Sequence, residues 1–355
     1  MSSSEENLYQ KIAQIQPVCR QSMQKAEERW NQVAKPLGSL GKLEQAVIQI
    51  AGITRSERVD ISKKGLLILC ADNGVVAEGV TQTGQEVTAV VAENFLDLRS
   101  CVAIMCRDAG TDIFPVDIGM AVDTPRVERR KIAYGTKNMY LEPAMTRDEA
   151  ISAVETGIRI VGEKAKAGYQ ILATGEMGIG NTTTSSAVTS VLLDLPVEAV
   201  TGRGAGLTGA GLARKIDVIQ TAIAKHRPDP SDPLNVLAKV GGFDIAGLAG
   251  VFLGGALYHI PIVADGFIST AAALIAVRLQ PLTADYILAS HLSKEPAGEL
   301  LLQTIGKTPF LTCDMCLGEG SGAVALFPIL DMAVHIYQEM SSFSEAGFGT
   351  YVPLE

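Results

Sequence analysis

Short apolar runs that end in polar, glycine-containing turns recur along the chain. Each run has the length of a strand and is followed by residues typical of a loop, so each predicts a buried β-strand. The runs are KKGLLILCAD (63–72), TDIFPVDIGM (111–120), YQILATGEMGIGN (169–181) and HIPIVADGF (259–267).

Stretches with a helical spacing of apolar residues lie between these strands, at 86–107, 147–167, 182–193 and 211–226. Strand and helix in alternation predict right-handed crossovers and a mostly parallel, Rossmann-like α/β sheet flanked by helices. Ligands bind such sheets beyond the carboxyl ends of the strands. Those ends lie at Asp72-Asn73, Gly175-Glu176 and Asp265-Gly266.

The two ends of the chain have a different character. Residues 5–30 are charged, with Leu8, Ile12 and Ile15 at helical spacing, and KPLGSLGKLE (35–44) interrupts the helix. The segment 331–340 also looks helical. We expect a large α/β catalytic domain of residues 36–330 and a small helical domain formed by 1–35 with 331–355.

Composition supports the α/β class and excludes several partners. Hydrophobic residues make up 47% of the 355 residues but aromatic residues only 5%, and small apolar side chains suit buried parallel strands. A net charge of −9 argues against nucleic acid and against an anionic membrane as partner. The absence of a long apolar run or a signal-peptide core, with six cysteines lacking framework spacing, predicts a cytoplasmic protein.

The motif GEMGIGNTTT (175–184) follows a predicted strand and opens a predicted helix. It matches a P-loop except that Asn181 stands where the lysine for a triphosphate is required, so nucleotide triphosphate hydrolysis is disfavoured. Free N–H groups and hydroxyls at a helix N-terminus suit one phosphate. The alternative interpretation is a tight turn with a threonine-rich helix start.

A second glycine motif, RGAGLTGAGLARK (203–215), contains G-x-G-x-x-G at Gly204, Gly206 and Gly209. A dinucleotide fold is disfavoured because no acid stands at the distance required for a ribose. Lys215 can supply a cation to the same phosphate, or can be an ordinary solvated lysine of a helix.

Glu319 lies in LGEGSGAVALF, where glycines on both sides let the backbone approach a ligand closely. Few groups there can solvate a carboxylate, so we expect a raised pKa, which suits a general base near neutral pH. The alternative is a glutamate that caps a helix. Glu176 is a second carboxylate in a glycine loop.

Cys313 and Cys316 have the spacing of metal ligands, but a structural zinc requires four ligands and no second pair exists. The four histidines are scattered. We therefore predict buried, inert thiols and expect neither a metal nor another cofactor.

Taken together, these motifs resemble those of the nicotinate-nucleotide–dimethylbenzimidazole phosphoribosyltransferase family, which makes the lower-ligand nucleotide of cobamides. The resemblance implies a six-stranded parallel sheet, a small helical domain from both chain ends and a dimer with its site near the interface. It implies transfer of phosphoribose from nicotinate mononucleotide to an aromatic base, with inversion and release of nicotinate. The matching pieces are KPLGSLGKLE, ADNGV (71–75), GTKNM, EPAMTRDEA, GEMGIGNTTT, GRGAGL with LARK, ADGF, ASHLSKEP (289–296) and LGEGSGA.

The resemblance and the loop chemistry together assign roles to residues. Glu319 matches the general base and Glu176 an active-site acid that faces the ribose and base. The residues expected around the phosphate and ribose are Gly178, Gly180, Asn181, Thr182, Gly204, Ala205, Lys215, Asp265 and Ser293. Those expected around the acceptor base are Thr83, Val91, Met177 and Leu317.

The sequence departs from the family pattern in places. Asn73 replaces the histidine of ADHGV, EPAG (295–298) replaces EPGH, and Val91 falls where benzimidazole-using members can carry glutamine. A pocket without that hydrogen-bond partner discriminates less among acceptors, which raises the hypothesis of a phenolic acceptor. The alternatives are then a phenol-specific subunit that works with a paralogous partner, or a non-catalytic subunit of such a pair.

Overall fold

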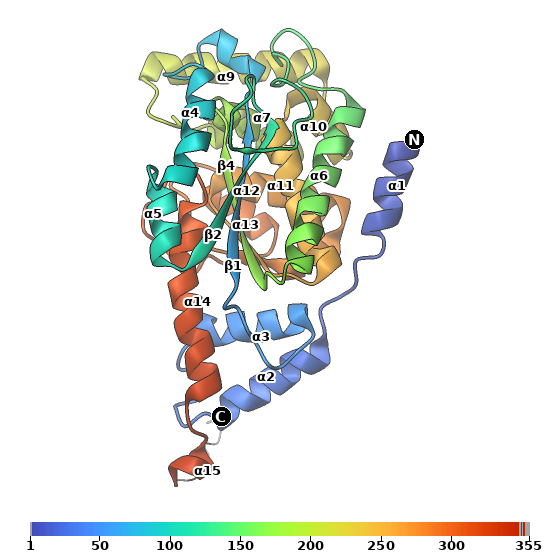
Figure 1. Cartoon of the computed structure of the whole chain (residues 1–355). Helices are drawn as coiled ribbons and strands as arrows, with labels where there is room; N and C mark the ends of the chain where they lie inside the picture. Colours follow the sequence, from blue (N-terminus) through green and yellow to red (C-terminus); the bar gives the residue numbers. More distant parts are fainter. Residues whose placement is uncertain (1, 348, 350, 352–355) are drawn as a thin grey trace.

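A parallel sheet forms the centre of the molecule (Figure 1). The computed structural model describes residues 2–347, 349 and 351. Within them the sheet has six strands in the order β3-β2-β1-β4-β5-β6. Their bounds are β1 (Lys64–Ala71), β2 (Thr111–Gly119), β3 (Glu128–Arg129), β4 (Ile171–Met177), β5 (Ile262–Ala264) and β6 (Ile287–Ala289). The predicted α/β class and parallel sheet are confirmed.

Strand β1 lies in the middle of the sheet and is buried along its whole length. Its residues alternate between two hydrophobic cores, as strand geometry requires. Leu67 and Leu69 belong to the core on one face, and Leu66 and Ile68 to the core on the other. Both faces of the sheet are therefore covered, which explains the continuous apolar run in the sequence.

Helices α6 (Arg147–Lys166) and α11 (Phe243–Tyr258) pack together over one face (Figure 1). Their backbones approach so closely that a Cβ on Gly157 would collide with the carbonyl oxygen of Gly247. On the other face, α14 (Ser321–Glu339) contacts α3 (Lys42–Thr54) and α5 (Cys101–Asp108). Further helices are α7 (Asn181–Leu193), α8 (Val197–Val200), α9 (Gly209–His226), α10 (Pro233–Val240), α12 (Phe267–Leu279), α13 (Gly298–Thr304) and α15 (Phe343–Ala346).

Three expected helical stretches have different bounds in the structure. The stretch 86–107 is two helices, α4 (Glu86–Asn94) and α5 (Cys101–Asp108), because Leu98 turns the chain with φ +54°. The N-terminal stretch is α1 (Ser3–Ile12) and α2 (Arg20–Gln32), with Pro17 in the link between them. The helix expected at 331–340 is the second half of α14, which starts at Ser321 and ends at Glu339.

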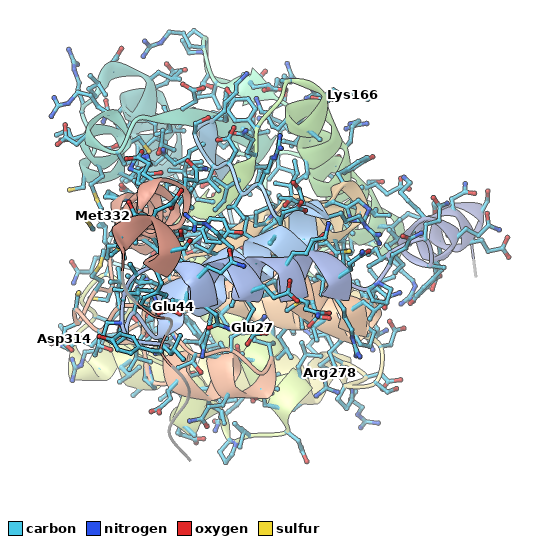
Figure 2. The ribbon with its side chains drawn as sticks, turned by 90° about the horizontal axis from the view of Figure 1, so that it is seen from below. Glu27, Glu44, Lys166, Arg278, Asp314 and Met332 are labelled. Carbon is cyan, nitrogen blue, oxygen red and sulfur yellow. The ribbon has the colours of Figure 1, made fainter. Side chains whose placement is uncertain are left out.

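The two ends of the chain meet beneath the sheet. The rings of Trp30 and Tyr337 lie 5.2 Å apart between centroids, and Val33 forms an antiparallel bridge with Ser342. Seen from below, Glu44 of α3 and Met332 of α14 lie on helices that contact each other (Figure 2). This arrangement is compatible with the expected small domain, and the division into two domains stays a prediction.

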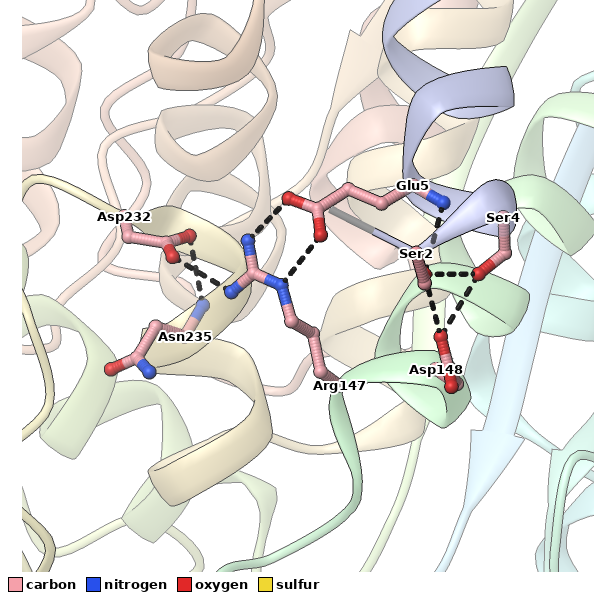
Figure 3. A network of polar contacts seen from close by, with 7 residues as sticks. All are labelled: Ser2, Ser4, Glu5, Arg147, Asp148, Asp232 and Asn235. Atoms are coloured by element: carbon pink, nitrogen blue, oxygen red, sulfur yellow. Dashed lines mark hydrogen bonds and ion pairs between the residues drawn. The ribbon is translucent and has the colours of Figure 1, made fainter.

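Helix α1 lies apart from this cluster and packs against α6 (Figure 1). Arg147 at the start of α6 links α1 to the rest of the molecule. Its guanidinium donates to Glu5 of α1 at 2.6 Å and to Asp232, at the start of α10, at 2.7 Å (Figure 3). Asp148 accepts hydrogen bonds from Ser2 and Ser4 in the same network. In the part of the chain that is described, no helix combines the length and hydropathy needed to cross a membrane.

Candidate active site

A cavity of about 220 Å³ opens beyond the carboxyl ends of β4, β5 and β6. Of the predicted site residues, those that line it are Glu176, Met177, Gly178, Asn181, Thr182, Gly204, Ala205, Asp265, Ser293, Leu317 and Glu319. The chain brings these together from segments as distant in sequence as those of Glu176 and Glu319, because the carboxyl ends of parallel strands lie at one edge of the sheet.

The N-terminus of α7 forms one end of the cavity. Gly180 caps this helix with φ +95°, and the first residues, Asn181 and Thr182, line the cavity wall. A Cβ on Gly180 would lie 2.8 Å from Val76, so this tight turn excludes other residues. Such a helix start suits an anion.

Lys215 contacts the first turn of α7 from outside the cavity. The predicted alternative of a solvated lysine is wrong, since only 1% of Lys215 is exposed. Its ammonium donates to the Thr182 hydroxyl at 2.9 Å and to the Gly202 carbonyl at 3.2 Å. Burial lowers the pKa of Lys215 to about 8, and the nearby Glu295 acts in the opposite direction. The lysine therefore places a positive charge beside the first turn of α7.

Asn181, which stands at the P-loop lysine position, joins two buried carboxylates. Its side-chain amide donates to Glu176 and, at 3.0 Å, to Asp244. Burial raises the pKa of Glu176 to about 8, with the charge of Asp244 adding to the effect. Burial also raises the pKa of Asp244 to about 6. Glu176 is thus largely protonated at neutral pH.

Glu319 lies on the cavity wall between Gly318 and Gly320 and has an unusual backbone, with φ +63°. Gly175 packs against its carbonyl so closely that a Cβ there would lie 2.5 Å from the oxygen. The Oε2 atom is buried and has no hydrogen-bond partner among the described residues. Burial raises the pKa of Glu319, and a hydrogen bond from the Val102 backbone acts in the opposite direction. The predicted rise is confirmed.

Asp265 holds the segment that carries Glu319. Its carboxylate accepts from the backbone N–H groups of Gly320 (3.1 Å), Gly322 (2.8 Å) and Ala323 (3.2 Å). It therefore caps the N-terminus of α14 and fixes the backbone next to Glu319.

Sequence reasoning missed two residues of the site. Asp244 is fully buried beside Glu176, but in the sequence it is a lone acid at the head of an apolar stretch. His291 lines the cavity after β6, and its Nδ1 lies 3.1 Å from the Ser290 hydroxyl. Its position at the carboxyl end of a short strand is the signal that would have found it.

Four predicted residues differ from expectation or stay untested, although one of them, Cys316, does line the cavity. Thr83 and Val91 are not among the described residues that line the cavity, so their role in an acceptor pocket stays a prediction. The expectation of buried thiols at Cys313 and Cys316 is wrong, because both are exposed. They lie in a loop with the exposed Asp314, and connecting loops run over the surface of a protein. No cluster of metal-ligating side chains occurs in the described parts of the chain.

A cavity at the edge of a parallel sheet, with a helix start at one end and carboxylates of raised pKa on its wall, is typical of the active site of an α/β enzyme. A family model described as Phosphoribosyltransferase matches residues 15–348, and the chain belongs to that family. The protein is therefore a pentosyltransferase.

The chain is similar over almost its whole length to proteins called nicotinate-nucleotide–dimethylbenzimidazole phosphoribosyltransferase. The protein of that name from Ruminiclostridium cellulolyticum is 49% identical over 97% of this chain and 98% of its own, and that from Acetivibrio thermocellus is 46% identical over 98% and 99%. The crystal structure of CobT from Thermus thermophilus matches with a TM-score of 0.88 at 37% identity, over 93% of this chain and 100% of that one. A phenolic acceptor gains no support from these relatives.

Proposed function

We propose that the protein transfers the phosphoribosyl group of nicotinate mononucleotide to 5,6-dimethylbenzimidazole, which yields the α-riboside 5′-phosphate and nicotinate. The names of its relatives support these substrates. The observation that carries the mechanism is the Glu319 carboxylate, which lies on the cavity wall with Oε2 buried and unpaired among the described residues.

In the proposed reaction, one ring nitrogen of the benzimidazole forms a bond to C1′ of the ribose. The bond from C1′ to the nicotinate nitrogen breaks, and its electron pair stays on that nitrogen. Glu319 takes the proton from the second ring nitrogen of the benzimidazole. A raised pKa makes Glu319 a stronger base than an exposed glutamate, as long as the pH exceeds that pKa.

The charges around the cavity suit this sequence of events. Nicotinate mononucleotide carries a positive ring nitrogen, and positive charge develops at C1′ as the bond to that nitrogen breaks. Glu319 and Asp265 line the same cavity and stabilise positive charge there. At the other end, the N-terminus of α7 with Thr182 and Lys215 binds the 5′-phosphate.

The test is to incubate the purified protein with nicotinate mononucleotide and 5,6-dimethylbenzimidazole and to identify the riboside phosphate by mass spectrometry. Phenol serves as the comparison acceptor. We expect turnover with the benzimidazole, whereas no product, or faster turnover of phenol, would overturn the proposal. Glu319→Gln should lower kcat by about 10²-fold or more while nucleotide binding, measured by calorimetry, persists.

A further inference from the structure

The loop between α13 and α14 exposes two thiols that the proposed reaction does not use. Cys313 and Cys316 are free and exposed, and Asp314 between them lies at the surface of the molecule (Figure 2). Free cysteines are usually buried, and buried thiols are inert. An exposed pair in C-x-x-C spacing is therefore open to reagents in solution.

One of these thiols belongs to the wall of the active-site cavity. Cys316 lines the cavity and is followed by Leu317, Gly318 and Glu319, which line it too. Cys313 is not among the described residues of the cavity wall. A covalent change at the pair therefore acts next to the predicted acceptor pocket and the proposed base.

The backbone holds the pair in a short, bent stretch. Leu311 and Met315 accept hydrogen bonds, at 2.9 Å and 3.1 Å, from backbone N–H groups of the segment ASHLSKEP (289–296). Between these two anchors the chain bends at Cys313, and Asp314 has φ +54°. The stretch between the thiols is therefore not extended, which shortens the distance that a disulfide has to span.

A metal ion fits this pair less well than a disulfide does. A thiolate metal site requires further ligands, and no group of three or more ligating side chains occurs in the described parts of the chain. Two thiols alone suffice for thiol–disulfide exchange. Because both thiols are exposed, a small disulfide can reach them.

We propose that Cys313 and Cys316 form a reversible disulfide by exchange with a small disulfide such as oxidised glutathione, and that this disulfide lowers the affinity for the acceptor base. The pair is thus a modification site that adjusts the enzyme to the thiol–disulfide balance of its surroundings. The effect on catalysis rests on the proposed function, whereas formation of the disulfide does not depend on it.

The exchange proceeds in two steps and needs no other reagent. The thiolate of one cysteine attacks a sulfur of the small disulfide, which forms a mixed disulfide and expels one small thiol. The thiolate of the other cysteine then attacks the protein sulfur of the mixed disulfide and expels the second small thiol. Each cysteine loses its proton, the pair is oxidised by two electrons, and the small disulfide is reduced to two thiols.

The disulfide constrains the wall on the predicted acceptor side of the cavity. Joining the sulfur atoms brings the Cβ atoms of the two cysteines to about 4 Å from each other. Cys316 directly precedes Leu317, a predicted residue of the acceptor pocket, so Leu317 moves with it. The phosphate end, formed by the start of α7 with Lys215, belongs to other elements and keeps its structure.

The test compares the wild type with Cys313→Ser/Cys316→Ser and with Cys101→Ser as the matched control. Cys101 is also an exposed cysteine, but it lies in α5. After treatment with oxidised glutathione, mass spectrometry of the unreduced digest should show the disulfide between Cys313 and Cys316 in the wild type and in the control. The KM for 5,6-dimethylbenzimidazole should rise roughly 10-fold in both, the cost of a lost pocket contact, and dithiothreitol should reverse the rise.

In the double variant, oxidised glutathione should leave this KM at the value of the untreated variant. Absence of the disulfide, an unchanged KM in the oxidised wild type, or an equal rise in the double variant would overturn the inference. A lost response in Cys101→Ser would overturn it as well, because the reactive pair would then include Cys101.

Calorimetry separates this inference from the proposed reaction. The reduced and the oxidised wild type should bind inorganic phosphate equally, while the oxidised form should bind 5,6-dimethylbenzimidazole about 10-fold more weakly. If the protein shows this difference but makes no riboside, the proposed reaction fails and the redox site stands. If riboside forms and the disulfide does not, the inference alone fails.

Discussion

Glu319 combines two unfavourable features at a single residue. Its backbone has φ +63°, a conformation that costs a side-chain-bearing residue about 1 kcal/mol or more, and its carboxylate is partly buried with an unpaired oxygen. Natural sequences keep such features where activity requires them. The local strain is therefore consistent with the role proposed for this carboxylate.

Replacing Glu319 by glycine should separate stability from activity. Glycine adopts positive φ without strain, and the substitution also removes the buried carboxylate. We expect the free energy of unfolding to stay the same or rise by about 1 kcal/mol while turnover is lost. Thermal unfolding with an activity assay checks this, and a clear fall in Tm would show that Glu319 stabilises the fold.

Glu176 should make stability depend on pH. Its pKa rises from 4.5 to about 8 on folding, so between these values the folded protein binds more protons than the unfolded chain. The stabilisation is complete below pH 4.5 and is lost as the pH rises through about 8. Asp244, with a pKa raised to about 6, acts in the same direction over the lower part of this window.

Urea unfolding of the wild type and of Glu176→Gln between about pH 5 and pH 8 measures this effect. The free energy of unfolding should fall with pH in the wild type and fall less steeply in the variant, because glutamine does not titrate. The pH is kept at or below 8 because Lys215, whose pKa is lowered to about 8, acts in the opposite direction above that value. Equal slopes in the two proteins would contradict the assignment.

At the scale of elements, the start of α14 links stability to the position of the base. Asp265 accepts three N–H groups there, so Asp265→Ala should destabilise the protein by about 2 kcal/mol and also lower kcat, because the segment with Glu319 loosens. Thr146→Ala is the matched control, since Thr146 caps α6 through a capping box and does not line the cavity. It should cost about 1 kcal/mol and leave kcat unchanged. Chemical unfolding and steady-state kinetics distinguish the two, and an unaltered kcat in Asp265→Ala would remove its positioning role.

Some elements could be predicted from the sequence and others could not. The strands β1, β2 and β4 are long apolar runs with polar ends, so their pattern is visible. Strand β3 has two exposed residues, Glu128 and Arg129, which no pattern distinguishes from a loop. Helix α11 is buried almost throughout, so it lacks the polar face that reveals a helix.

The parts of the site that could be predicted are those formed by a short, continuous stretch of sequence. The glycine loops and Glu319 could be found because a helix start and an acid between glycines are local patterns. The pairing of Asp244 with Glu176 through Asn181 depends on contacts across more than 60 residues of chain, which spacing does not reveal. The capping of α14 by Asp265 was missed for the same reason.

At the scale of the whole molecule, large apolar side chains remain exposed on neighbouring elements. Val90 is 60% exposed on α4, Leu98 47% after it, Ile104 42% on α5 and Met332 55% on α14. Helix α5 contacts α14, so the helices that carry Ile104 and Met332 are neighbours. Such a surface is typical of an interface between copies of a chain.

We therefore expect the purified protein alone to form a dimer in solution, as measured by light scattering. Ile104→Glu should shift the population towards the monomer, because it would bury a charge at the interface. The comparison is Glu86→Ala, which removes a charge from an exposed position of α4 where Ile104→Glu adds one to α5. A wild type that is monomeric at all concentrations would contradict the expectation.

The turn around Glu319 also limits how this enzyme can be evolved in the laboratory. Residues 318, 319 and 320 have positive φ in succession, and a Cβ at Gly318 would lie 2.5 Å from the Glu176 carboxylate. A glutamate at position 318 or 320 therefore could not take the place of Glu319. A library that selects for new acceptors should keep these three codons and randomise Met177 and Leu317, which line the cavity without such backbone constraints.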